Sequence, residues 1–137
     1  MRGPIRDLRR FYEMLLREGK TESGGQILSE ESVWKMTTRQ RVDQFDHSFQ
    51  HTVDFGLGVI INSNRYGAET VPYGFGRYAS ESSFGHGGAQ SSIGFADPEH
   101  RLVVCAVANG CPGEERHNAR FRELNSAIYE DLGLTPR

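Results

Sequence analysis

The sequence has few cysteines, no long hydrophobic run and no excess of charge of one sign. Its 137 residues include two cysteines, Cys105 and Cys111, too few for a disulfide framework or a zinc site. The two could close a short loop, but two unpaired thiols are the simpler expectation. A net charge of −2 provides no field that attracts nucleic acid or an anionic membrane. We therefore expect no nucleic-acid partner.

Long apolar segments are also missing. No run approaches the roughly 18 residues of a membrane-spanning helix, and the first ten residues contain no signal-peptide core. We expect a globular segment with no membrane span, and the sequence leaves its cellular compartment open. The length suits one domain that can bury a core.

Glycine is the residue type in excess. The chain has 16 glycines, about 12% against a usual share of about 7%. Eleven of these 16 lie between Phe55 and Gly113. The hydrophobic share of 36% comes near the usual apolar share of roughly 45–50% once glycine is added, and the charged share of 25% is ordinary for a globular protein.

Helical patterns occupy both ends of the chain. Apolar residues recur at helical spacing over 5–16, and Gly19 supplies a stop. Ser29 is a candidate N-cap for a short second helix that reaches Thr37. The C-terminal helix has its stripe at Phe121, Leu124, Ile128 and Leu132.

The middle of the chain predicts strands. Residues 55–61, 91–96 and 101–108 are rich in apolar and β-branched side chains, whereas 39–54 has no clear period and is expected to be irregular. The turn at 97–100 should join the last two strands as an antiparallel hairpin. Residues 102–108 are apolar on both faces, which predicts a strand in the middle of the sheet. The expected fold class is an α+β sandwich, an antiparallel sheet flanked by helices.

The densest glycine cluster is Phe-Gly-His-Gly-Gly-Ala-Gln at 84–90. One interpretation is a tight turn or bulge that needs a positive φ, and pattern alone favours it. The other is that a ligand approaches the backbone closely, where side chains are excluded and N–H groups stay free to donate.

Six segments follow one another along nearly the whole chain: 6–16 (Arg-Asp-Leu-Arg-Arg-Phe-Tyr-Glu-Met-Leu-Leu), 27–37, 55–58 (Phe-Gly-Leu-Gly), 84–88 (Phe-Gly-His-Gly-Gly), 94–100 and 107–110 (Val-Ala-Asn-Gly). Their order resembles the C-terminal part of the serine β-lactamase-like superfamily. Class C β-lactamases, D-alanyl-D-alanine carboxypeptidases and related carboxylesterases are the nearest types. The resemblance implies an incomplete β-lactamase/transpeptidase-like fold. Residues 1–54 would then belong to the helical region of a parent protein, and 55–137 to its sheet region.

The resemblance also implies roles for the glycine cluster. His86-Gly87-Gly88 matches the family's third motif, K-T-G or its variants, on the strand opposite the catalytic serine. The N–H of Ala89 would be one of two oxyanion donors, while Gly87, Gly88 and Gln90 would border the substrate. His86 in the place of a lysine anchors a substrate carboxylate weakly at neutral pH, which favours an ester or peptide substrate. A histidine that merely caps a turn stays open as the alternative.

The family's other two motifs are missing from this sequence. Ser32-Val33-Trp34-Lys35 has the letters of S-x-x-K, but it lies in a segment with its own counterpart downstream of the true motif. No tyrosine is followed two places later by asparagine. We therefore expect a C-terminal fragment of a serine hydrolase that acts on an ester, a lactam or a D-Ala-D-Ala amide, without metal or cofactor, and is inactive alone. The substrate of the parent protein is expected to be a small molecule or a peptide.

Two further expectations complete the hypothesis. A non-catalytic module that binds a peptide or ligand on the same sheet edge is the alternative function. If the chain is a fragment, its isolated sheet edge favours self-association.

The remaining candidates have simpler explanations. His47, His51, His100 and His117 have no metal-site spacing and are expected to be solvated loop histidines. Whether the aromatic residues around the motif line a cleft or pack under a loop stays open; they are Tyr73, Phe75, Tyr78 and Phe84.

Overall fold

The computed structural model describes residues 3–136; residues 1, 2 and 137 lie outside the described part. The helices are α1 (Ile5–Leu16), α2 (Glu30–Thr37) and α3 (Glu114–Asp131), with a 3-10 turn η1 (Asn64–Tyr66). The strands are β1 (Phe45–Asp46), β2 (His51–Thr52), β3 (Asp54–Phe55), β4 (Ile60–Ile61), β5 (Phe84–Gly88), β6 (Ser92–Asp97) and β7 (Leu102–Val107).

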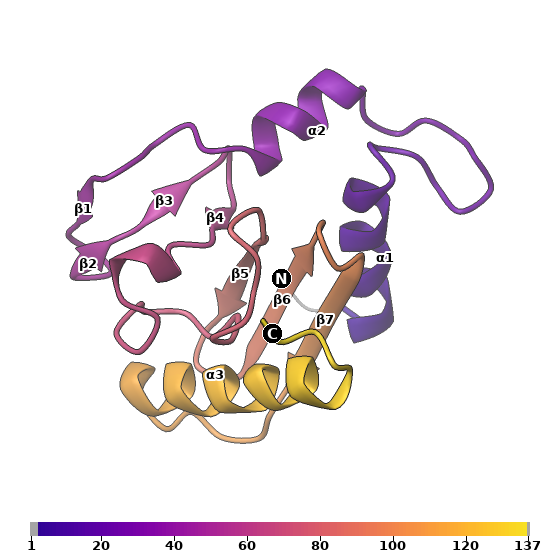
Figure 1. The fold of residues 1–137 in the computed structure, drawn as a ribbon. Coiled ribbons are helices and arrows are strands. Elements are labelled where there is room, and N and C mark those ends of the chain that lie inside the picture. Colours follow the sequence, from indigo (N-terminus) through magenta and orange to yellow (C-terminus); the bar gives the residue numbers. More distant parts are fainter. Residues whose placement is uncertain (1–2, 137) are drawn as a thin grey trace.

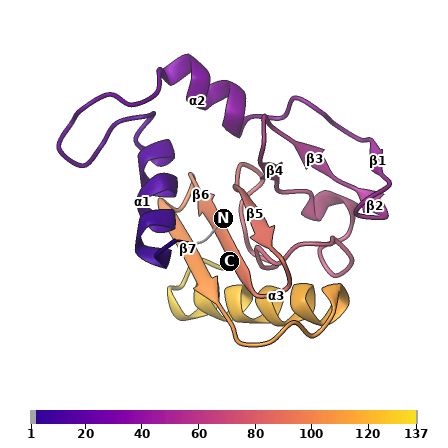
Figure 2. The same ribbon diagram turned by 180° about the vertical axis from the view of Figure 1, so that it is seen from behind.

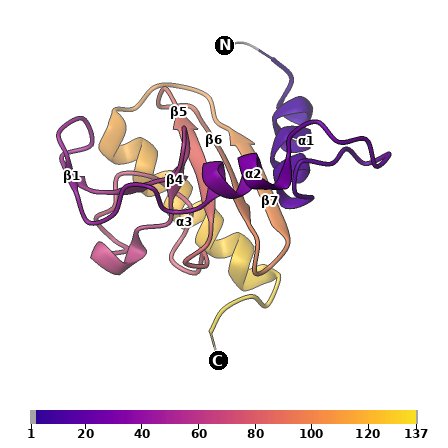
Figure 3. The ribbon, with the colours of Figure 1, turned by 90° about the horizontal axis from the view of Figure 1, so that it is seen from above.

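Five strands form one antiparallel sheet in the order β3-β4-β5-β6-β7. Among the described residues, the two short strands β1 and β2 pair with each other and with no other strand. Helix α3 runs along one face of the sheet, and α1 lies on the opposite side (Figures 1 and 3). These layers confirm the predicted antiparallel sheet flanked by helices.

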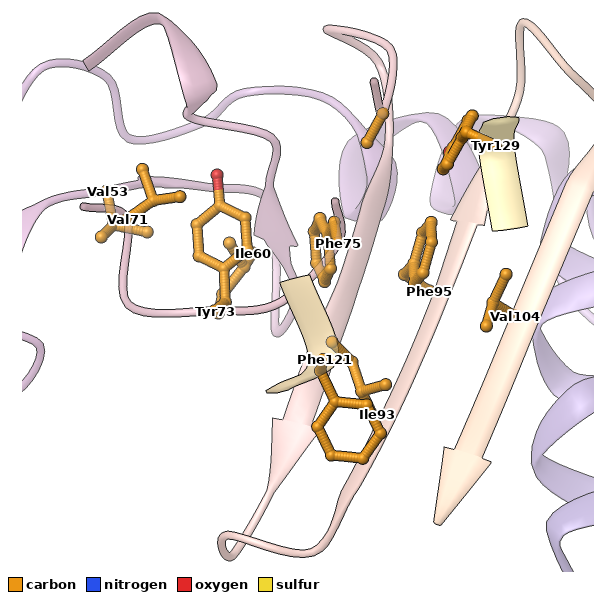
Figure 4. Close-up of a cluster of buried hydrophobic side chains, with 11 residues drawn as sticks. Val53, Ile60, Val71, Tyr73, Phe75, Ile93, Phe95, Val104, Phe121 and Tyr129 are labelled. Atoms are coloured by element: carbon orange, nitrogen blue, oxygen red, sulfur yellow. The ribbon is translucent and has the colours of Figure 1, made fainter. Parts of the chain in front are cut away.

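The larger core fills the space between the sheet and α3. Strands β6 and β7 direct alternate residues to this side, as the two-residue period of a strand requires. The Phe75 and Phe95 rings stack with centroids 4.9 Å apart, and Phe121 and Tyr129 close the cluster from α3 (Figure 4). The buried members are Val53, Ile60, Val71, Tyr73, Phe75, Ala79, Ile93, Phe95, Val104, Phe121 and Tyr129.

A second core lies between the sheet and the pair α1 and α2. Its buried members are Tyr12, Met14, Leu15, Val33, Val59, Ile61, Phe84 and Ala96. Gly94 of β6 permits the close approach of α1, because a Cβ there would lie 2.6 Å from Cε2 of Tyr12. Burial raises the pKa of the Tyr12 phenol well above its usual value, and a hydrogen bond with the backbone of His86 opposes that shift. Helix α1 thus packs on β6 and β7 and meets β5 through Tyr12 beside Phe84.

The predicted helix over 5–16 and the predicted N-cap at Ser29 agree with the structure. Helix α1 begins after Pro4, and the side chain of Ser29 accepts from the Ser32 N–H at 3.1 Å at the start of α2. None of the helices in the described residues is long and apolar enough to cross a membrane.

The predicted strand over 55–61 is wrong. The segment folds back on itself as β3 and β4, and the Gly56 N–H donates to the Val59 carbonyl at 3.0 Å across the turn. Gly58 has a φ of 84°, which a continuous strand would not contain. The two glycines therefore mark a tight turn, and the segment 39–54, expected to be irregular, contributes β1, β2 and the first residue of β3.

The hairpin of β6 and β7 is confirmed, but the middle position of β7 is wrong. Within residues 3–136 β7 is the last strand of the sheet. It is apolar on both faces because Val104 faces the α3 core while Val103 and Cys105 pack against the α1 core. A strand that is apolar on both faces is therefore one that is covered by a layer on each face, and this pattern does not require a neighbouring strand on each side.

The predicted stripe of α3 is partly wrong. Phe121 is buried and Ile128 partly buried, but Leu124 and Leu132 are 46% and 56% exposed. The buried face instead carries polar side chains, His117, Asn125 and Ser126, in addition to Phe121 and Tyr129. Two of these polar side chains form hydrogen bonds with the backbone of loop 74–77. Asn125 donates to the Gly74 carbonyl, and the Ser126 hydroxyl accepts from the Arg77 N–H at 2.9 Å.

Candidate functional site

A cleft of about 320 Å³ lies where β5 extends beyond β4. All five predicted site residues line it: His86, Gly87, Gly88, Ala89 and Gln90. The rest of its lining comes from three other segments: Ser48 and Phe49 of the β1–β2 loop, Pro72 to Gly74, and Glu114, His117 and Asn118 of α3, with Ile60 and Ile93 at the base. A larger hollow of about 860 Å³ lies between α1 and residues 21–28 and contains none of the motif residues. The smaller cleft is therefore the candidate site.

The last three residues of β5 form an open edge of the sheet. Strand β4 pairs with β5 only at Phe84 and Gly85, whereas β6 pairs with all five residues of β5. On the side of β4, the backbone groups of 86–88 thus have no strand partner within residues 3–136. Unpaired N–H and C=O groups along an extended strand are what an extended ligand needs for hydrogen bonding.

The backbone conformation at Gly87 and Gly88 does not require glycine. Neither Gly87 nor Gly88 is among the described glycines with a positive φ. A Cβ on Gly87 would meet its nearest atom, Nε2 of His117, at an ordinary 3.7 Å, and one on Gly88 would meet the rotatable hydroxyl of Ser92. By contrast, a Cβ on Gly85 would overlap the backbone of Gly94. The positive-φ explanation of the motif therefore does not hold for Gly87 and Gly88.

Ala89 is exposed in the turn between β5 and β6, and Gln90 anchors that turn. Gln90 has a φ of 55°, its side-chain oxygen accepts from the Gly113 N–H at 2.8 Å, and its carbonyl accepts from Arg120 at 2.7 Å. The Gln90 side chain thus ties the turn to the start of α3. Arg120 was not expected from the sequence, because its role depends on a contact between residues 30 positions apart.

His86 is exposed at the cleft. Its Nδ1 lies 2.7 Å from the Gly87 carbonyl oxygen, and its ring centroid is 6.4 Å from that of Phe49. Phe49 comes from the segment expected to be irregular, and no periodic pattern marks it as a cleft residue.

His117 is not the solvated loop histidine predicted from the sequence. It lies on α3 with 4% of its surface exposed, its ring edge-on to Phe121 with centroids 5.0 Å apart. Its Nδ1 is enclosed and has no hydrogen-bond partner in residues 3–136. Burial lowers the pKa of the imidazole, although the Glu114 carboxylate and a backbone hydrogen bond with Gln90 oppose the shift. The ring is therefore kept neutral beside the motif.

Ser32 and Lys35 lie away from the cleft. The Ser32 hydroxyl is 2.8 Å from that of Ser29, and Lys35 pairs with Glu31 at 2.6 Å on the exposed side of α2. The serine does not contact the lysine in a nucleophile–base pair. This placement agrees with rejecting the letters S-x-x-K as a nucleophile motif here.

The other sequence candidates fall outside the cleft or into the core. His51 contacts the Thr70 hydroxyl at 3.0 Å, and the His100 ring lies against Tyr129. Phe75 and Phe84 are core residues, whereas Tyr73 is buried and also lines the cleft. Residues 3–136 hold no cluster of potential metal ligands, and Cys105 and Cys111 are both free thiols.

The comparisons with known proteins identify the family. A family model described as Beta-lactamase matches residues 1–128, so the chain belongs to the Beta-lactamase family. Its fold is that of the serine hydrolases of this superfamily, as the resemblance predicted. No curated protein matches the sequence significantly.

Solved structures share the fold over part of their length. A β-lactamase from Mycobacterium bovis aligns with a TM-score of 0.65 at 22% identity, over 88% of this chain and 41% of that one. EstA from Arthrobacter nitroguajacolicus aligns at 0.53 and 24% identity, over 90% and 32%. A protein assigned as a 6-aminohexanoate-dimer hydrolase from Bacillus anthracis aligns at 0.60 and 15% identity, over 97% and 30%. The chain therefore spans less than half of each of these relatives.

Proposed function

We propose that this chain supplies the motif strand and one oxyanion donor of a serine hydrolase that acts through an acyl-enzyme. The substrate's carbonyl group would lie along the open edge of β5, with its oxygen toward the N–H of Ala89. The nucleophilic serine, the lysine and the tyrosine would come from a part of the protein outside these 137 residues. Residues 1–54 would belong to the helical region of that protein and 55–137 to its sheet region.

The observation that carries the proposal is the open edge at Gly87, a glycine that the fold does not require. A Cβ at Gly87 meets nothing closer than 3.7 Å in the protein, so the free space is available to a ligand. An oxyanion donor must be held in place before the reaction begins, because moving it into place during the reaction would use part of the free energy by which it stabilises the transition state. The two hydrogen bonds at Gln90 supply that rigidity next to Ala89.

His86 supports an ester or peptide substrate over one anchored by its carboxylate. Its exposed imidazole is placed to hydrogen-bond a substrate or an incoming tyrosine, but at neutral pH a typical imidazole is mostly uncharged. It therefore offers less attraction to a carboxylate than the lysine of K-T-G.

By itself the chain is proposed to be inactive. Its sequence contains no Tyr-x-Asn segment, and residues 3–136 place no serine and lysine in contact at the cleft. Binding of a substrate-like ligand at the open edge is a separate property, which the isolated chain retains.

The same open edge favours one alternative, a non-catalytic module that binds a peptide by strand addition. Backbone hydrogen bonds would give affinity, and the cleft would select side chains. The coding sequence upstream of Met1 separates the two functions. An in-frame S-x-x-K followed by Y-x-N supports the hydrolase, and a start codon at Met1 with no such segment supports the module.

The role of Ala89 is tested in the protein that includes the upstream-encoded motifs. Ala89→Pro removes the N–H, and loss of one oxyanion donor is expected to lower kcat by about 10²–10³-fold with a smaller effect on KM. Ala89→Ser keeps the N–H and serves as the control. Both variants are compared by thermal unfolding, and a folded Ala89→Pro protein with kcat within threefold of the parent contradicts the proposal.

A further inference from the structure

We propose that Asn109 is a site of self-modification. Its side-chain amide is converted without an enzyme to a carboxylate, which then pairs with Arg120 and draws that residue away from the turn that holds Ala89. The loop that contains Asn109 connects β7 to α3. Neither step needs a nucleophilic serine, so both take place in these 137 residues whether or not the hydrolase function holds.

The reaction needs an asparagine followed by a glycine, and Asn109-Gly110 is the one such pair in the sequence. The Gly110 nitrogen loses its proton to a base in the solvent and attacks the side-chain carbonyl carbon of Asn109. The side-chain nitrogen takes up a proton and leaves as ammonia, and a five-membered cyclic imide remains. One water molecule then opens the imide at either carbonyl, which gives aspartate or isoaspartate. In sum, water is taken up, ammonia is released and nothing is oxidised or reduced.

The structure leaves the attacking nitrogen accessible. Asn109 and Gly110 are both exposed, and Gly110 has a φ of 81°, a conformation that glycine adopts readily. The Gly110 N–H has no acceptor within residues 3–136, and a Cβ placed on Gly110 would meet nothing within 4 Å. The nitrogen therefore breaks no hydrogen bond when it loses its proton, and the space around it is open.

The other four asparagines are held by hydrogen bonds. Two of them donate from their side-chain nitrogen to backbone carbonyls of the loop before β5, and two lie within α3, where the next N–H is bonded in the helix. They are Asn62, Asn64, Asn118 and Asn125. The side chain of Asn109 forms no hydrogen bond within residues 3–136, so it is free to turn towards the next nitrogen.

Arg120 of α3 is the group that responds to the new charge. Its Nη1 lies 3.3 Å from the Asn109 carbonyl oxygen, and its Nη2 lies 3.4 Å from that of Gly110 and 2.7 Å from that of Gln90. All three acceptors are neutral, and Arg120 forms no salt bridge within residues 3–136. A carboxylate on residue 109 is attached to a residue that the guanidinium already contacts, and an ionised acceptor forms a hydrogen bond about twice as strong as a neutral one.

The Gln90 carbonyl loses its partner when Arg120 turns towards the new carboxylate. That hydrogen bond and the one from the Gly113 N–H to the Gln90 side chain hold the turn that contains Ala89. With one of the two released, the turn gains freedom beside the N–H of Ala89. Isoaspartate adds to this effect because its main chain runs through one extra carbon.

The first test follows the modification in the folded 137-residue chain. After incubation at neutral pH, trypsin releases Asn109 in the peptide 102–116 and the other asparagines in separate peptides. We expect the 102–116 peptide alone to gain about 1 Da and to become a substrate of isoaspartyl methyltransferase. Because an exposed loop opens at little cost, the rate should be within about tenfold of that of the free 102–116 peptide. Asn109→Gln is the control and should stop the reaction, since its longer side chain cannot close a five-membered ring.

The second test detects the response of the turn. Asn109→Asp carries the carboxylate from the start and is expected to shift the amide signals of Ala89 and Gln90 in a ¹H–¹⁵N spectrum. Pro112→Asp places the same charge in the same exposed loop, on a residue to which Arg120 donates no hydrogen bond within residues 3–136, and should leave both signals in place. In an Arg120→Gln background, Asn109→Asp should no longer shift them.

Either test can overturn the inference. A folded chain whose 102–116 peptide keeps its mass while the free peptide reacts shows that the loop blocks the attack. An Asn109→Asp variant that leaves Ala89 and Gln90 unmoved, or moves them equally with and without Arg120, shows that the guanidinium does not respond. The proposed function survives each of these results, because it is tested separately by Ala89→Pro.

Discussion

At the scale of single residues, Asp97 is the buried carboxylate that joins the β6–β7 hairpin to α3. It is fully buried and accepts from the Ser80 N–H at 2.9 Å, the Ser80 hydroxyl at 2.6 Å and the Tyr129 hydroxyl at 2.6 Å. The N–H groups of Glu99 and His100 also donate to it in the turn. Burial alone would raise the pKa of Asp97, but these hydrogen bonds outweigh it and hold that pKa below its usual 3.8.

Replacing Asp97 by asparagine leaves several of these donors without an acceptor. We expect Asp97→Asn to lower the free energy of unfolding by about 2–4 kcal/mol, since each donor left unpaired in a buried site is costly. Urea denaturation followed by circular dichroism measures the change. Asp131→Asn, at an exposed position near the end of α3, is the control and should change stability by less than about 0.5 kcal/mol.

The same carboxylate makes stability fall in acid. Because its folded pKa lies below the unfolded value of 3.8, Asp97 contributes its full stabilisation above pH 3.8 and loses it as the pH falls through the folded pKa. The stability difference between wild type and Asp97→Asn should therefore be constant from pH 7 to 5 and shrink below pH 4. A difference that grows with acidity would contradict the charged state assigned to Asp97.

The two cysteines should differ in reactivity. Burial raises the pKa of the Cys105 thiol to about 11, whereas Cys111 is exposed in the loop before α3. Only the thiolate reacts with disulfide reagents. At pH 8 the folded chain should therefore show one fast thiol with DTNB, and Cys111→Ser should remove it. Cys105→Ser should keep it, and two fast thiols in the native protein would contradict the packing of β7.

At the scale of elements, the glycines of β5 and β6 serve different purposes. Gly94 is required by packing, because α1 crosses β6 there and a Cβ would press on Tyr12. We expect Gly94→Ala to destabilise the protein by about 1–3 kcal/mol through overpacking. Gly87→Ala should stay within about 0.5 kcal/mol, because its Cβ would meet only ordinary contacts. Thermal unfolding of the two variants compares them directly, and a Gly87→Ala loss as large as that of Gly94→Ala would make Gly87 a structural glycine.

Local patterns were sufficient to predict α1, α2 and the β6–β7 hairpin. These elements are specified by helical spacing, by the Ser29 cap and by the turn at 97–100. The order and motif of 84–90 also located β5, whose residues line the cleft. Propensity cannot reveal the turn inside 55–61, because Gly56 and Gly58 are compatible with either a strand or a reversal.

The part of the site that the sequence did not predict depends on tertiary contacts. His117 and Phe49 line the cleft and Arg120 bonds its Gln90 turn, all from segments distant from the motif, and no local spacing marks them. His117 occupies the buried face of α3, which carries polar residues where the pattern placed leucines. Asn125 and Ser126 lie on that face because they form hydrogen bonds with backbone groups of the loop 74–77, against which the helix packs.

At the scale of the whole molecule, β7 ends the sheet within the described residues, as the view from behind shows (Figure 2). Strand β7 has six residues, and its outer edge, which has no strand partner within residues 3–136, is a template for pairing with another chain. Val107, at its end, is 64% exposed. We expect the isolated chain to associate through this edge as its concentration rises.

Sedimentation equilibrium tests this association. Val107→Lys should shift the chain towards the monomer, because a charge at a strand edge opposes pairing. Leu57→Lys, in the turn between β3 and β4 and 54% exposed, is the matched control and should leave the association unchanged. A monodisperse wild-type monomer at every concentration would argue against an incomplete sheet.

The most direct test of the central claim is labelling by a fluorophosphonate probe, which reacts with activated serines. The probe is applied to the 137-residue chain and to the protein that includes the region encoded upstream of Met1, and labelled peptides are identified by mass spectrometry. The account predicts no labelled serine in residues 1–137 and one labelled serine in the upstream region. Stoichiometric labelling of Ser32, or of any other serine of this chain on its own, would contradict it.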